Sequence, residues 1–194
     1  MTTTNILLAG VGGQGIMLAG EILARLGLEL GFDVKKSEIH GMAQRGGSVE
    51  SHVRMGPEIL SPLIPRGRAD FLVALEQGEA LRYVDFPEDG ATVLLSNTRF
   101  IPSGVTAGLD SYPPETRIME ELSGLGLRVI AVDTEALVRK IGNPRALNII
   151  MLGRLSTLLP FPEETWKSVI TDMLPEKILA VNLRAFDLGR ATLG

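Results

Sequence analysis

Four glycines fall within the six residues from Gly10 to Gly15, directly after the apolar run Asn5–Ala9 and directly before a segment with helical apolar spacing. A strand, a glycine turn and a helix start in this order leave unpaired N–H groups and the positive end of the helix at one point. Glycine lets the chain turn tightly there and lets a ligand approach the backbone. The sequence therefore predicts an anion-binding cradle formed by Gly10, Gly12, Gly13, Gln14 and Gly15.

Three interpretations of this glycine string remain open. A dinucleotide site needs an acidic residue about 20 positions further on, which holds a ribose hydroxyl. Glu38 is the candidate, although Lys35 and Lys36 precede it and a second glycine-rich loop follows. The string can instead hold another phosphate-bearing ligand, or it can serve only the close packing of a helix on its strand.

Short apolar runs and amphipathic segments alternate along the chain. Strands are expected at 5–9, 34–39, 49–55, 70–76, 91–96 and 127–132, because each run is bounded by Gly, Pro or charged residues. Helices are expected at 14–30, 77–84 and 113–125, and further helices start at Asp133 or Thr134, Pro144, Pro162 and Pro175. We therefore expect an α/β fold: a three-layer, Rossmann-like, mostly parallel sheet with helices on both faces and a helical C-terminal third. Residues 1–194 contain no repeat or dividing linker and are expected to form a single domain.

The helix expected at 14–30 is apolar on two sides, and its charged residues lie in one row, Glu21, Arg25 and Glu29. Such a helix packs under its own sheet and against a neighbouring helix, or it uses one apolar side as a contact with another subunit. Asn148 and Asn182 lie on apolar stretches, where an amide usually serves as a hydrogen-bonded structural group.

Charge and composition exclude several classes of function. The net charge of −4 gives no basic surface for nucleic acid, and the chain has neither a lysine-rich amphipathic run nor an apolar run of membrane-spanning length. The N-terminal residues lack the positive charge of a secretory signal, so we expect a cytoplasmic protein. The absence of cysteine excludes disulfides, thiol catalysis and an iron–sulfur cluster held by thiolates of this chain.

Few side chains mark a catalytic or metal site. His40 and His52 could face each other across two strands, but without a carboxylate cluster they make a poor metal site, and no metal is expected. Neither a nucleophile elbow nor a P-loop lysine is present. No catalytic residue is assigned to this chain.

A second glycine-rich loop follows the strand expected at 34–39 and contains Arg45, Gly46 and Gly47. A single arginine between small residues leaves its guanidinium free and the backbone amides accessible, which suits recognition of phosphate or carboxylate. The alternative is a solvated turn in which Arg45 pairs with a structural carboxylate.

The two loops and several later segments carry a resemblance to a known family. The matching strings are Gly10-Val11-Gly12-Gly13-Gln14-Gly15-Ile16, Ser37 through Ser48, Leu60-Ser61-Pro62-Leu63-Ile64, Ser96-Asn97-Thr98, Asn148 with Leu152-Gly153, and Asn182-Leu183-Arg184-Ala185-Phe186 with Gly189. In these strings the chain resembles the small, gamma-type component of 2-oxoacid:ferredoxin oxidoreductases. Within that family it is most similar to the members that act on indolepyruvate.

The resemblance implies a reaction in which a 2-oxoacid, here an arylpyruvate, reacts with coenzyme A and ferredoxin to give acyl-CoA, carbon dioxide and reduced ferredoxin. This chemistry needs thiamine diphosphate with Mg²⁺ and 4Fe-4S clusters. The chain has no cysteine and no Gly-Asp-Gly element of the kind that holds the diphosphate. We therefore expect it to bind none of these cofactors alone, and to rely on a larger alpha subunit that carries them and passes electrons to ferredoxin.

For this chain the resemblance implies a role at the partner's site. Gly12, Gly13, Gln14 and Gly15, together with Arg45, Gly46 and Gly47, either cover that site and hold phosphates of coenzyme A, or only pack against the partner and shape its pocket. The alternative substrates are those of pyruvate, 2-oxoisovalerate and 2-oxoglutarate ferredoxin oxidoreductases. Two hypotheses from other functional classes stay open: a stand-alone nicotinamide or flavin enzyme, and a nucleotide-binding sensor module.

Overall fold

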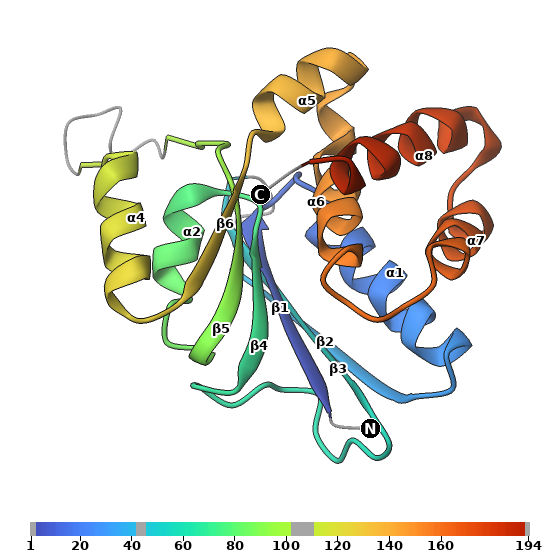
Figure 1. The fold of residues 1–194 in the computed structure, drawn as a ribbon, viewed down its shortest axis with the longest axis horizontal. Helices are drawn as coiled ribbons and strands as arrows, with labels where there is room; N and C mark the ends of the chain where they lie inside the picture. Colours follow the sequence, from blue (N-terminus) through green and yellow to red (C-terminus); the bar gives the residue numbers. More distant parts are fainter. Residues whose placement is uncertain (1–2, 42–45, 102–110, 193–194) are drawn as a thin grey trace.

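The computed structural model describes residues 3–41, 46–101 and 111–192, and its middle layer is a six-stranded sheet (Figure 1). The strand order is β2-β3-β1-β4-β5-β6. The strands are β1 (Thr4–Val11), β2 (Asp33–His40), β3 (Ser48–Gly56), β4 (Ala69–Ala74), β5 (Pro87–Ser96) and β6 (Arg128–Val132). The pairs β1–β4, β4–β5 and β5–β6 are parallel, whereas β3 runs antiparallel to both β1 and β2. The expected mostly parallel α/β sheet is confirmed.

Two strand boundaries differ from the sequence expectation for local reasons. β5 begins at Pro87 rather than at 91, because Pro87 pairs with Ala69 before the register shifts, although charged residues interrupt its apolar pattern. β4 ends at Ala74 rather than at 76, because Glu76 turns away from the sheet and caps the following helix with its side chain.

Helices cover both faces of the sheet (Figure 1). On one face, α1 (Ile16–Glu29) packs on β2 and β3 and against the C-terminal helices α6 (Leu147–Ser156) and α7 (Glu163–Met173). On the other face lie α2 (Gln77–Arg82) and α4 (Glu115–Gly124). The packing of α1 under its own sheet and beside other helices is thereby confirmed. None of the helices in the described part of the chain is both long and apolar enough to cross a membrane.

The C-terminal third is helical, as expected. It consists of α5 (Thr134–Ile141), the short 3-10 helix η1 (Pro144–Ala146), α6, α7 and α8 (Glu176–Arg190). Asp133 caps α5 by accepting a hydrogen bond from the N–H of Ala136. The helix expected from Pro144 starts as η1, because the Asn143 side chain accepts from the N–H of Arg145 and tightens the first turn.

The helices α6 and α8 touch through their backbones. A Cβ atom built on Gly153 would lie 2.2 Å from the carbonyl oxygen of Phe186, and one on Gly189 would lie 2.0 Å from that of Ile150. These two glycines therefore allow a closer approach than any side chain permits. The ring of Phe186 lies 5.9 Å from that of the buried Trp166 of α7, so the crossing is part of the larger core.

Candidate functional site

The two glycine loops meet at one edge of the sheet. Because β1 and β3 pair in register from Thr4 opposite Met55 to Val11 opposite Ser48, the loop after β1 and the loop before β3 emerge side by side. The N–H of Gly12 donates a 2.8 Å hydrogen bond to the carbonyl oxygen of Gly47. The structure thus joins the two segments that the sequence marked separately.

The backbone conformation of the two loops favours glycine at several positions. Gly13, Gly15 and Gly46 have φ angles of 107°, 81° and 76°, which residues with a side chain rarely adopt. Arg45, the cation predicted for this loop, lies outside the described residues.

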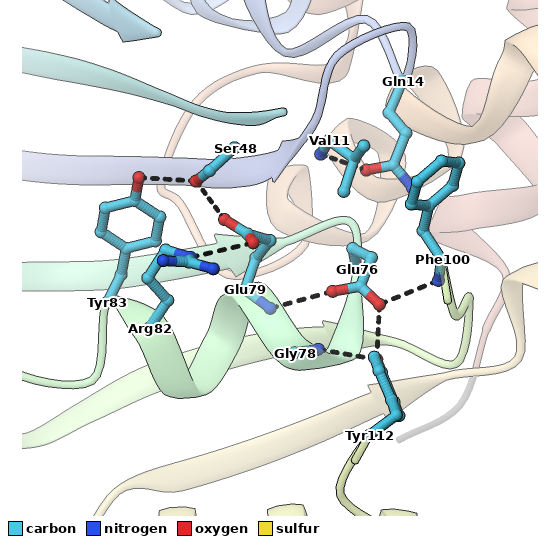
Figure 2. Close-up of polar contacts among 10 residues, drawn as sticks. All are labelled: Val11, Gln14, Ser48, Glu76, Gly78, Glu79, Arg82, Tyr83, Phe100 and Tyr112. Carbon is cyan, nitrogen blue, oxygen red and sulfur yellow. Dashed lines mark hydrogen bonds and ion pairs between the residues drawn. The ribbon is translucent and has the colours of Figure 1, made fainter. Parts of the chain in front are cut away.

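Gln14 braces the first loop through its side-chain amide. Its Oε1 accepts a 2.7 Å hydrogen bond from the N–H of Val11, and its Nε2 donates a 3.0 Å bond to the carbonyl of Leu75 (Figure 2). A Cβ on Gly10 would lie 2.7 Å from Oε1 of Gln14, so the absence of a side chain there makes room for the brace. Of the residues predicted for the cradle, Gln14 thus uses its amide to fix the loop against the end of β4.

We expect Gln14→Ala to lower the stability of the chain, because it leaves the Val11 N–H and the Leu75 carbonyl without partners. An unpaired buried polar group costs roughly 1–3 kcal/mol, and the urea midpoint should fall accordingly. Gln14→Glu still accepts from Val11 but places a carboxylate oxygen against the Leu75 carbonyl, so its midpoint should also fall below that of the unchanged chain. An unchanged midpoint for Gln14→Ala would show that the two hydrogen bonds of Gln14 do not contribute to stability.

A first cavity of about 440 Å³ lies beside the start of α1. The side chain of Asn148 helps to shape this start, because its Nδ2 donates a 3.1 Å hydrogen bond to the carbonyl of Gly15. The structural role expected of Asn148 is therefore confirmed. Glycine backbone and the first turn of α1 dominate the cavity lining, which consists of Val11, Gly12, Gly13, Gly15, Ile16, Met17, His40 and Val49.

A second cavity, of about 690 Å³, has the second glycine loop and α2 among its walls, and Val11 lines both cavities. Its walls combine apolar and aromatic side chains with two carboxylates and one guanidinium. The residues are Val11, Gly46, Gly47, Ser48, Glu76, Gly78, Glu79, Leu81, Arg82, Phe100, Ser111, Tyr112 and Pro113.

Glu76 is the buried centre of one hydrogen-bond cluster in this cavity (Figure 2). Its carboxylate accepts from the N–H of Glu79 at 2.9 Å, from the N–H of Phe100 at 3.0 Å and from the hydroxyl of Tyr112. The same hydroxyl accepts from the N–H of Gly78 at 2.9 Å. Burial, together with the hydrogen bond to Glu76, raises the pKa of Tyr112.

A second cluster connects the glycine loop with α2 (Figure 2). The hydroxyl of Ser48, the residue after Gly47, donates to Oε2 of Glu79 and lies 2.8 Å from the hydroxyl of Tyr83. The other oxygen of Glu79, Oε1, accepts a 3.0 Å hydrogen bond from Nε of Arg82. Desolvation by burial raises the pKa of Tyr83.

No sequence motif marks these side chains as functional. The strand expected at 70–76 includes Glu76, although an acidic residue directly before a predicted helix is a capping signal. Nothing in the local sequence connects Ser48 with Glu79, because their contact depends on how β3 lies against α2.

The two histidines do not face each other, which corrects the sequence expectation. The register places His40 opposite Val49 and His52 opposite Ser37. His52 is three positions after Val49 on the same strand, so the two imidazoles lie on opposite faces of the sheet. Nδ1 of the buried His52 accepts from the N–H of Ile64 at 3.2 Å, and burial lowers its pKa against the opposing effect of Glu50.

Glu38, the candidate for a ribose hydroxyl, is engaged in an ion pair. Its Oε1 lies 2.7 Å from Nζ of Lys36, which also contacts Glu21 of α1. Burial opposes the charge on Lys36, but these two carboxylates raise its pKa overall. In the described ranges, no group of three or more acidic or histidine side chains is arranged to hold a metal ion.

Comparison with known proteins identifies the family. The model of the family described as "Pyruvate ferredoxin/flavodoxin oxidoreductase" matches residues 5–192. The chain is 42% identical to the indolepyruvate oxidoreductase subunit IorB of Archaeoglobus fulgidus, a match that covers 95% of this chain and 92% of that protein. It is 39% identical to IorB of Thermococcus kodakarensis, with 97% and 95% covered.

A solved structure gives the same result. The 2-oxoglutarate:ferredoxin oxidoreductase from Magnetococcus marinus, with 2-oxoglutarate, coenzyme A and succinyl-CoA bound, superposes with a TM-score of 0.76 at 26% identity. The match covers 98% of this chain and 31% of that one. The chain therefore belongs to the pyruvate ferredoxin/flavodoxin oxidoreductase family, within which it groups with subunits of 2-oxoacid:ferredoxin oxidoreductases.

Proposed function

We propose that this chain is the small subunit of an indolepyruvate:ferredoxin oxidoreductase. The assembled enzyme converts an arylpyruvate, coenzyme A and oxidised ferredoxin to an acyl-CoA, carbon dioxide and reduced ferredoxin. The near full-length identity to two IorB subunits supports this substrate class. The matches to 2-oxoglutarate and ketoisovalerate enzymes are weaker, at 30% identity or below.

The redox cofactors belong, in this proposal, to a larger partner subunit. A 4Fe-4S cluster needs thiolate ligands, and the chain contains no cysteine. Thiamine diphosphate supplies the electron sink for decarboxylation when it is bound. The Gly-Asp-Gly element that would hold its diphosphate is absent from this sequence. The chain is therefore inactive alone.

The chain's own contribution is to bind phosphate groups of coenzyme A at the joined glycine loops. The observation that carries this proposal is the hydrogen bond from Gly12 to Gly47, because it unites the N-terminus of α1 and the second loop in one surface. Backbone N–H groups at a helix N-terminus favour an anion. Arg45 is the cation that we propose to accompany Gly13, Gly15, Gly46 and Gly47 in this role. Gly12 contributes by holding the two loops together, because its N–H is donated to Gly47.

Turnover of a panel of 2-oxoacids tests the proposed function. We expect the chain, co-expressed with a larger cofactor-bearing subunit of the same family, to reduce a viologen dye with coenzyme A and indolepyruvate or phenylpyruvate. Pyruvate, 2-oxoisovalerate and 2-oxoglutarate should give a kcat/KM at least about tenfold lower, a difference of about 1.4 kcal/mol in transition-state binding.

The separate subunits provide the control for this assay. Reduction of the dye by the lone chain would contradict the division of labour between subunits. A preference for 2-oxoglutarate or pyruvate would contradict the substrate class but leave the family role intact. Binding of a nicotinamide or flavin cofactor by the lone chain would instead support a stand-alone nucleotide-binding protein.

A further inference from the structure

We propose that Arg82 binds an oxyanion, the phosphate or carboxylate of a small-molecule substrate, in the second cavity. This inference rests on the proposed function, because it assigns a substrate anion to the cavity that the second glycine loop lines. Among the described residues that line the cavity, Arg82 is the one cation.

The guanidinium of Arg82 is held by one edge and open at the other. Its Nε donates to Oε1 of Glu79 at 3.0 Å, and Glu79 itself is buried to all but 7%. The terminal nitrogens Nη1 and Nη2 have no hydrogen-bond partner among the described residues. A guanidinium fixed through Nε presents its remaining N–H groups as a planar fork, the geometry that matches carboxylate and phosphate.

The carboxylate that orients Arg82 is itself fixed to the glycine loop. Its second oxygen accepts from the hydroxyl of Ser48, which follows Gly47 directly in the chain and also contacts the hydroxyl of Tyr83. Figure 2 shows these contacts as a continuous chain from Tyr83 to Arg82. The fork is thereby held in a defined position relative to the second glycine loop, as a preorganised binding group requires.

The carboxylates of this cavity do not make it a cation site. Glu79 is paired with Arg82, and Glu76 accepts from two backbone N–H groups and the hydroxyl of Tyr112. The charged donors that remain open therefore belong to the guanidinium. Leu81, Phe100 and Pro113 add apolar surface to the same cavity, which suits an oxyanion attached to an aromatic or aliphatic body.

Two substrates of the proposed reaction carry such an oxyanion: coenzyme A through its phosphates and the 2-oxoacid through its carboxylate. Steady-state kinetics of the assembled enzyme distinguish them. In Arg82→Gln we expect the KM of one of the two substrates to rise about tenfold while kcat stays within about twofold, since the lost contact corresponds to about 1.4 kcal/mol. Arg82→Lys keeps the charge but loses the fork, so it should recover only part of the affinity.

The matched control is Arg117→Gln. Arg117 lies on α4, its side chain is 67% exposed against 61% for Arg82, and it also pairs with a glutamate of its own helix. Both KM values of this variant should remain unchanged. Dephospho-CoA gives a further readout: if Arg82 holds the 3′-phosphate, the effect of Arg82→Gln on the KM disappears with this substrate.

The outcomes separate the inference from the function on which it rests. Unchanged KM values for both substrates in an active Arg82→Gln enzyme would overturn the inference and leave the proposed function standing. Weakened subunit assembly with normal KM values would also overturn it, because Arg82 would then contact the partner. Absence of turnover in the unchanged complex with every 2-oxoacid would instead reject the proposed function.

Discussion

Replacing Gly153 with alanine is expected to lower the free energy of unfolding by about 3 kcal/mol, the upper part of the range for overpacked cores. The added Cβ would lie 2.2 Å from the carbonyl oxygen of Phe186 and 3.0 Å from its carbonyl carbon. Both atoms belong to the backbone of α8, so no side-chain rotation relieves the contact. The helices α6 and α8 must therefore separate, which opens the core around Trp166.

Urea denaturation of the purified chain measures this effect, followed through the fluorescence of Trp166, the single tryptophan. The matched control is Gly124→Ala at the end of α4, where a new Cβ meets no atom within 4 Å. Alanine in a helix is favoured over glycine by up to about 1 kcal/mol, so this variant should be as stable as the unchanged chain or slightly more so. Equal midpoints for the two variants would mean that the close contact between α6 and α8 does not form.

The second large effect is expected from Gly15→Ala, and it concerns affinity. Gly15 has a φ of 81°, a conformation that costs alanine roughly 1–2 kcal/mol. A Cβ there would also lie 2.5 Å from Nδ2 of Asn148, the group that holds the Gly15 carbonyl. Both effects displace the first turn of α1, and under the proposed function the KM for coenzyme A should rise at least about tenfold.

Gly31→Ala is the control for the backbone strain alone. Gly31 has a φ of 80° and no atom within 4 Å of a new Cβ, and it lies at the far end of α1. This variant should lose some stability but keep its KM for coenzyme A. In Gly15→Ala/Asn148→Ala the collision is removed and the strain stays, so its KM should fall between those of Gly15→Ala and the unchanged enzyme. If Gly15→Ala and Gly31→Ala have the same KM, the turn does not bind coenzyme A.

The parts of the fold that were predictable are those with local causes. A strand before the glycine string and a helix after it are predicted from turn residues and apolar spacing in adjacent positions. The structure has β1 and α1 at these places. The helices beginning near Asp133, Pro162 and Pro175 follow from the same local signals. The resemblance to 2-oxoacid:ferredoxin oxidoreductases is also confirmed, because the family model matches residues 5–192.

The rest of the candidate site depends on contacts between segments that are distant in sequence. The pairing of β3 with β1, which brings Gly47 to Gly12, was not derivable from either loop. Periodicity also did not reveal that His40 and His52 lie on opposite faces, because this depends on the register of β2 and β3. The sequence does not mark Arg82 as a binding residue, because the orientation of its guanidinium depends on the contact with Glu79.

The hairpin formed by β2 and β3 separates the loop between them from the register of the sheet. The pair of His40 with Val49 fixes both ends of the intervening loop to the sheet. Insertions or exchanges between Gly41 and Gly46 therefore leave this strand pairing unchanged, whereas an insertion within β3 would turn its inward side chains outward. Under the proposed function, sequence changes in this loop can therefore alter what it binds while the strand pairing stays constant.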